Sequence, residues 1–178
     1  MRNVRLLSVV LVLALAVAVG CSTQRAGTQS VKDNVVKSLE QAGLKQIDVK
    51  EDRDKKVITL SGNVESEDQK NRAAEMAKSV APGWVVANEI GLRPEGVESE
   101  AREVSSNLDD AIENNFKAAL VASKLEDQHI RYDAKNGVLT LEGDVDTTQQ
   151  RQTVEKLAAS VPNVTQVVNK LEVKRARK

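Results

Sequence analysis

The chain has 178 residues, with 26 basic and 26 acidic side chains, one cysteine and only three aromatic residues. The neutral balance argues against bulk nucleic-acid binding, and a single cysteine excludes a disulfide within the chain. The hydrophobic core must therefore be built from aliphatic side chains and alanine.

The first twenty residues have the composition of a secretory signal peptide. Arg2 and Arg5 give a positive start, and residues 6–19 are apolar apart from Ser8. An apolar run of this length fits a signal-peptide core and is short for a membrane span. We therefore expect residues 1–20 to be a cleaved signal peptide, with a short membrane anchor as the alternative.

Cys21 follows this run directly, and Ala18-Val19-Gly20-Cys21 resembles a bacterial lipobox, although leucine is usual at the position of Ala18. The resemblance implies that Cys21 is lipidated, so that residues 21–30 form a lipidated tether. Two or more acyl chains give stable attachment to a membrane. Under the sorting rule of such lipoproteins, Ser22 implies the periplasmic face of the outer membrane. The alternative is a signal peptide without lipidation.

An internal repeat organises the rest of the chain. An offset of 81 positions aligns Val31–Leu92 with Ile112–Val173 without a gap and gives fifteen identical positions. Self-similarity at a fixed offset indicates two copies of one structural unit. We predict a first domain over 31–93, a linker over 94–106, a second domain over 107–173 and a basic tail over 174–178.

The order of elements follows from the apolar spacing. In the first copy Val31, Val35 and Leu39 lie four residues apart and predict one buried stripe of a helix. Ile47–Asp52 and Val57–Val64 alternate between apolar and polar residues and predict two strands. The second copy repeats this order.

A second helix and a last strand complete each copy. A capping box, in which a hydroxyl residue precedes glutamine by three positions, occurs at Ser66 and Gln69 and again at Thr147 and Gln150. The last strands are predicted at residues 85–92 and 165–173. The fold class is therefore α+β, with two tandem α-β-β-α-β domains, each a three-stranded sheet with two helices on one face.

Two glycines recur at one position inside the second predicted strand of each copy, Gly62 and Gly143. A glycine within a strand marks a bulge or a close approach of another backbone segment. We assign both a structural role.

Several motifs recur in both copies. They are Val57-Ile-Thr-Leu-Ser-Gly-Asn-Val64 and its counterpart at 138–145, each followed by a helix, and a closing Val-x-Asn at 86–88 and 167–169. The repeated unit resembles the BON domain, the bacterial osmotic-stress and nodulation family. With the signal peptide and lipobox, the whole resembles dual-domain outer-membrane lipoproteins. The resemblance implies a module that binds phospholipid or a membrane surface and supports envelope integrity under stress.

In such lipoproteins the first helix of the second copy contacts anionic lipid, which here implies the helix at 107–123. Leu108 is its apolar candidate contact and Lys117 its cationic one. Residues 107–173 carry 7 basic and 11 acidic side chains, however, and an anionic membrane repels such a surface.

Two further regions are candidate membrane contacts. Trp84 follows a helix-ending Pro-Gly, where an indole ring can rest at lipid headgroups; the alternative is that it covers the core or the interface between copies. The C-terminal tail contributes Lys174, Arg175, Arg177 and Lys178. Each cation near an anionic leaflet adds on the order of 1 kcal/mol. A solvated terminus is the alternative interpretation of the tail.

No set of residues predicts catalysis, a metal or a cofactor. His129 is the single histidine, whereas a metal site needs several ligands and a catalytic pair needs a positioned partner. We expect a lipid-anchored protein whose partner is membrane lipid, not nucleic acid. One alternative is an adaptor that docks an envelope protein, with the lipid only as an anchor. Another is a soluble, stress-induced periplasmic protein, which requires Cys21 to be unlipidated.

Overall fold

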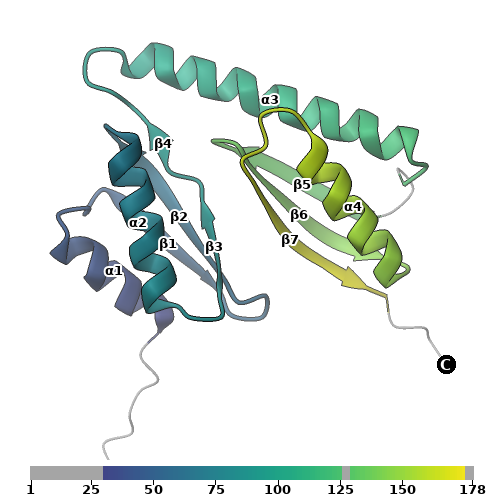
Figure 1. The fold of residues 1–178 in the computed structure, drawn as a ribbon, viewed down its shortest axis with the longest axis horizontal. Coiled ribbons are helices and arrows are strands. Elements are labelled where there is room, and N and C mark those ends of the chain that lie inside the picture. The colour runs from purple at the N-terminus through teal and green to yellow at the C-terminus, as the bar shows by residue number, and fades with distance from the viewer. Residues whose placement is uncertain (1–29, 126–128, 175–178) are drawn as a thin grey trace, which may run out of the picture.

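The computed structural model describes residues 30–125 and 129–174. The predicted signal peptide, Cys21 and the tail residues Arg175, Arg177 and Lys178 lie outside the described residues. The first domain contains α1 (Val31–Gln41), β1 (Ile47–Asp52), β2 (Val57–Val64), α2 (Glu67–Val80), β3 (Val85–Asn88) and β4 (Gly91–Leu92). The second contains α3 (Glu98–Ala122), β5 (His129–Lys135), β6 (Val138–Val145), α4 (Thr148–Ser160) and β7 (Gln166–Val173). The predicted α+β fold with two tandem repeats is confirmed (Figure 1).

Both sheets have the same topology. The central strand β2 pairs antiparallel with β1 and parallel with β3 and β4, which together form one edge strand. In the second domain β6 pairs antiparallel with β5 and parallel with β7. The parallel pairing requires a crossover helix, which α2 and α4 supply. The two helices of each domain cover one face of its sheet (Figure 1).

Each domain has its own aliphatic core between its helices and its sheet. Val35 and Leu39 of α1 are almost fully buried against Ile58 and Leu60 of β2. In the second domain Phe116 is fully buried, and its ring meets that of Tyr132 edge to face at 5.0 Å. The predicted helical stripes are therefore the buried faces of α1 and α3.

Helix α3 begins at Glu98, so residues 98–106, expected as linker, are helical. No proline or glycine interrupts the chain from there to Ala122, and acidic residues in the first turn favour a helix N-terminus. Pro94 and Gly96 precede the helix and leave only a short connection after β4. The second domain thus starts with a helix much longer than its counterpart α1.

The first strand of the second domain is displaced by two residues relative to the gapless repeat. Asp52 pairs with Val57 across a four-residue turn, whereas Lys135 pairs with Val138 across the two-residue turn Asn136-Gly137. Both turn residues have positive φ, as a tight hairpin requires. An even displacement keeps every side chain on its original face. The structural counterpart of Asp52 is therefore Lys135.

The helix-free faces of the two sheets meet each other. Val57 and Ala87 of the first domain form a small buried cluster with Val138 and Val168 of the second. The last two lie 81 positions after the first two, so equivalent residues meet. An approximate twofold axis therefore relates the two contacting faces.

Polar side chains complete this contact at the edge of β3. The side-chain amide of Gln166 accepts from the Asn88 N–H at 3.2 Å and donates to the Val86 carbonyl at 2.7 Å. Asn136 Nδ2 donates to the Glu89 carbonyl at 2.9 Å. An edge strand presents unpaired backbone groups, and these amides satisfy several of them.

Ion pairs also cross between the domains. Lys170 lies 3.5 Å from Asp52, Lys135 lies 3.8 Å from Glu89, and Lys55 contacts Glu172. Burial raises the pKa of Glu89 above its ordinary value, with the nearby Lys135 acting in the opposite direction. The interface is therefore a small apolar patch surrounded by charge.

Candidate functional site

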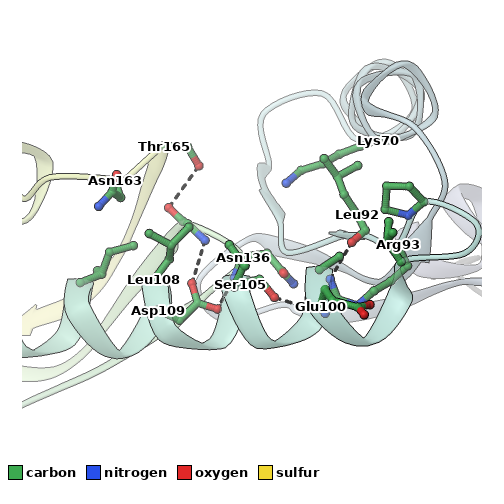
Figure 2. Close-up of a pocket in the computed structure, with 16 residues that line it drawn as sticks. Lys70, Leu92, Arg93, Glu100, Ser105, Leu108, Asp109, Asn136, Asn163 and Thr165 are labelled. Carbon is green, nitrogen blue, oxygen red and sulfur yellow. Dashed lines mark hydrogen bonds between the residues drawn. The ribbon is translucent and has the colours of Figure 1, made fainter.

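An apolar groove of about 610 Å³ runs along the N-terminal half of α3 (Figure 2). One wall is α3, and the other is formed by β4, the connection after it and the start of α2. Loops of the second domain close one end of the groove. Its apolar lining comes from Leu92, Pro94, Val97, Val104, Leu108 and Ile112.

The α3 wall has a regular apolar pattern. Val97, Ala101, Val104 and Leu108 are spaced by four, three and four residues, which places them on one face of a helix. The three larger side chains are 48%, 59% and 43% exposed. Clustered exposed apolar side chains mark binding sites more often than isolated ones do. This stripe is a candidate contact for an apolar ligand or partner.

Hydrogen bonds fix α3 against both domains. Asp109 accepts from the backbone N–H groups of Asn136 at 2.8 Å and Gly137 at 3.0 Å. On the other side, Arg93 donates to the Leu92 carbonyl at 2.7 Å and to Ser105 Oγ at 3.3 Å (Figure 2). These bonds attach the helix to the turn of one domain and the edge of the other. The groove is therefore preformed.

Both signs of charge line the groove. Lys70 reaches it from α2, and within residues 30–125 and 129–174 its ammonium group forms no ion pair (Figure 2). Glu100 lies on α3, where a backbone hydrogen bond and the Ser99 hydroxyl lower its pKa and keep it ionised. The groove thus offers two cations beside an apolar floor: Lys70, and Arg93, whose guanidinium is already bonded to the Leu92 carbonyl and Ser105.

The beginning and the end of the described chain lie on the side of the molecule opposite α3 (Figure 1). The Ser30 hydroxyl donates to Glu51, and this bond is the largest cause of the lowered pKa of that carboxylate. The neighbouring β1–β2 turn contacts β7 through Lys55 and Glu172.

A family model described as the BON domain matches residues 27–94 and 108–175. The chain belongs to the BON-domain family. A relative, Osmotically-inducible protein Y of Escherichia coli (strain K12), is 32% identical over 132 residues. The match covers 74% of this chain and 64% of the relative, so the chain spans less than two thirds of that protein's length.

Two solved structures of CdsD, a structural protein of the type III secretion system of Chlamydia trachomatis, also match. The first is 14% identical with a TM-score of 0.35 and covers 80% of this chain and 61% of that chain. The second, the C-terminal domain, is 13% identical with a TM-score of 0.34, and the match covers 79% of this chain and 63% of that chain.

The predicted contact residues do not form one site. Leu108 lies in the groove, and Lys117 is exposed further along α3. Trp84 is half-buried against the core of the first BON domain, beside the β1–β2 turn, where the next residue, Val85, donates its N–H to the Lys56 carbonyl at 2.9 Å. Lys174 directly follows β7 and lies 3.2 Å from Asp146. Among the candidates within residues 30–125 and 129–174, only Leu108 lines the groove.

Sequence reasoning missed the other groove residues on α3. Val97 and Val104 lie within residues 94–106, which were predicted to be a linker and not part of a helix. The four-three-four spacing from Val97 to Leu108 is the signal that reveals them.

Residues 30–125 and 129–174 contain no group of three or more His, Cys, Asp or Glu side chains that can hold a metal ion. Within the same ranges, no helix has the length and apolar character needed to cross a membrane.

Proposed function

We propose that this protein is a lipid-anchored member of the BON-domain family that binds membrane lipid in the cell envelope and supports its integrity under osmotic stress. The name of the Escherichia coli relative supports the association with osmotic stress. The sequence around Cys21 supports the anchor and the periplasmic face of the outer membrane. A tether from Ser22 to Ser30 reaches at most roughly 30 Å, which keeps the domains near the headgroups.

The observation that carries the lipid proposal is the apolar groove along α3. Its volume falls within the range of roughly 300–1,000 Å³ typical of ligand sites. An acyl chain gains about 0.8 kcal/mol for each methylene buried, and Val104 and Leu108 offer exposed apolar surface for that burial. Lys70 lies where it can pair with the phosphate of the same lipid.

Co-sedimentation with liposomes tests this proposal. The soluble form Ser22–Lys178 is mixed with neutral and with anionic vesicles at low and moderate salt, beside Val104→Glu. Val121→Glu is the matched control, because Val121 is an exposed valine of α3 outside the groove. We expect Val104→Glu to lose vesicle binding and the control to keep it. Equal vesicle binding by both variants would show that the groove does not bind lipid. An absence of vesicle binding by the unsubstituted protein would overturn lipid recognition as its function.

The basic tail is tested in the same assay with a form that ends at Val173. Electrostatic attraction to lipid weakens with added salt because the charges are screened. If the tail contacts lipid, its removal reduces binding to anionic vesicles at low salt and leaves binding to neutral vesicles unchanged. If removal of the tail leaves binding to both kinds of vesicle unchanged, the tail does not contact lipid.

A second candidate function is a protein-interaction adaptor with the lipid only as an anchor. The acidic character of the second BON domain favours it, because such a surface attracts a basic protein more readily than an anionic membrane. An adaptor keeps its partner on neutral lipid, whereas lipid recognition through charge requires anionic lipid. Replacing Cys21 with alanine and fractionating the cell envelope tests the anchor itself: release into the soluble fraction is expected.

A further inference from the structure

A second cavity, here called the inter-sheet cleft, lies between the helix-free faces of the two domains. It has a volume of about 450 Å³ and is lined almost entirely by polar side chains. Its bases are Lys50, Arg131, Lys135 and Lys170. Its acids are Glu89, Asp133 and Glu142, and two threonines, Thr59 and Thr140, complete the polar lining. The charges nearly cancel.

The charges in the cleft are reversed across the approximate twofold axis. Lys50 pairs with Thr59 in the first sheet, and Asp133 pairs with Thr140 in the second, so Lys50 and Asp133 are structural counterparts. Glu89 and Lys170 are counterparts by the repeat offset. These two positions therefore carry one sign in the first domain and the opposite sign in the second, whereas the counterpart of Glu142 is the neutral Ser61. The two threonines are the identical pair.

Several groups in the cleft have unused bonding capacity. In the part of the chain that the structure describes, Lys50 and Asp133 form no ion pair within 4 Å, although both influence the pKa of Glu89. The Lys135–Glu89 and Arg131–Glu142 pairs are 3.8 and 3.9 Å long, beyond a normal hydrogen bond. A ligand that supplies both an acceptor and a donor satisfies these groups.

We propose that the inter-sheet cleft binds a small zwitterion with an ammonium and a carboxylate group, the chemistry of a free α-amino acid. Lys50, with the threonine hydroxyls, is the donor for its carboxylate, because the Lys170 ammonium already donates to Glu142 at 3.3 Å and lies 3.5 Å from Asp52. Asp133 and Glu89 accept from its ammonium group. A simple anion or cation meets repulsion from half of the lining, whereas a dipolar molecule matches both halves. Because the ligand contacts both domains, its binding stabilises the contact between them.

Calorimetric titration of the soluble form Ser22–Lys178 with glycine tests this inference. Acetate and methylammonium each carry one half of the glycine charge and are titrated at the same ionic strength. We expect saturable glycine binding with a Kd on the order of 1 mM and at least about tenfold weaker binding of either half-ligand. Glycine binding is also expected to raise the Tm, because a ligand of the folded state stabilises it.

Variants locate the site. Lys50→Gln and Asp133→Asn are expected to weaken glycine binding about tenfold each. Lys37→Gln and Asp110→Asn are matched controls, because both residues are exposed on helices outside the cleft and are expected to leave binding unchanged. Acetate binding as tight as glycine binding would overturn the zwitterion assignment. An absence of saturable binding in the folded protein, or an equal loss in the controls, would overturn the site.

Discussion

Gly62 and Gly143 occupy equivalent backbone positions that only glycine fits without strain. Their φ angles are +109° and +111°, in the region that side-chain-bearing residues avoid. A Cβ atom on Gly62 would overlap the carbonyl oxygen of Gln46, just before β1, and one on Gly143 would overlap that of His129, the first residue of β5. The close approach expected from the sequence is therefore present in both sheets.

Replacing Gly143 with alanine is expected to destabilise the protein by at least about 2 kcal/mol, from backbone strain and this overlap together. Gly83→Ala is the matched control, because Gly83 has a φ of +81° but open space around its Cα. It is expected to cost about 1 kcal/mol from backbone strain alone. Urea unfolding measures both. An equal loss of stability in the two variants would show that the backbone beside Gly143 moves to accommodate the added methyl group at no cost.

The partly buried carboxylate of Glu89 predicts a pH dependence. Its pKa in the folded state is raised above 4.5, chiefly by burial. The folded protein therefore binds more protons than the unfolded chain between the ordinary and the raised value, so this group lowers stability as pH rises through that window. Glu89→Gln is expected to remove this decline. Urea unfolding of both proteins from about pH 4 to pH 7 measures the free energy of unfolding. An increase in the Glu89 contribution to stability with rising pH would contradict this prediction.

At the scale of elements, the two capping boxes predicted from sequence differ in the structure. In α4 the Thr147 hydroxyl accepts from the Gln150 N–H at 3.1 Å, and Gln150 accepts from the Thr147 N–H at 3.0 Å. In α2 the Ser66 hydroxyl accepts from Gln69 at the longer distance of 3.4 Å, and the Gln69 side chain accepts from Glu65. The reciprocal box is therefore complete only in α4.

Thr147→Ala is expected to cost about 1 kcal/mol of stability, the usual effect of losing an N-cap. Ser66→Ala is expected to cost less because its capping bond is longer and lacks the reciprocal partner. Thermal and urea unfolding of the two variants provide the comparison. A larger loss for Ser66→Ala would contradict this ranking.

Apolar spacing and capping signals were sufficient to predict both repeats, because they act within one element or between neighbouring ones. The length of α3 and the start of the groove were missed, since the charged stretch before Asn107 has no core-facing counterpart in the first repeat. The displacement of β5 was missed because it is confined to that strand. The strands after the hairpin turn, β2 and β6, still align at an offset of 81 residues, so the repeat alignment hides the shift. The contact between domains depends on tertiary packing, which periodicity within a repeat does not encode.

At the scale of the molecule, the reversed charges favour pairing of the first domain with the second over pairing of like domains. Asp52 contacts Lys170, and the equivalent pair across the axis is Lys135 with Glu89. A pairing of two first domains would place Glu89 beside Asp52, and a pairing of two second domains would place Lys170 beside Lys135. Like charges in contact are unfavourable, so each face selects the other repeat.

Exchanging one of these pairs tests that selectivity. Glu89→Lys alone and Lys135→Glu alone each place like charges 3.8 Å apart and are expected to loosen the contact between domains. The double variant restores an opposite pair and is expected to recover about 0.5–1 kcal/mol relative to the sum of the single changes, a modest value because the lysine is half exposed. A double-mutant cycle in urea measures this coupling, while small-angle X-ray scattering detects the expansion of the single variants. Additive effects in the cycle, with unchanged scattering, would mean that the apolar patch and the Gln166 amide hold the domains together without help from charge.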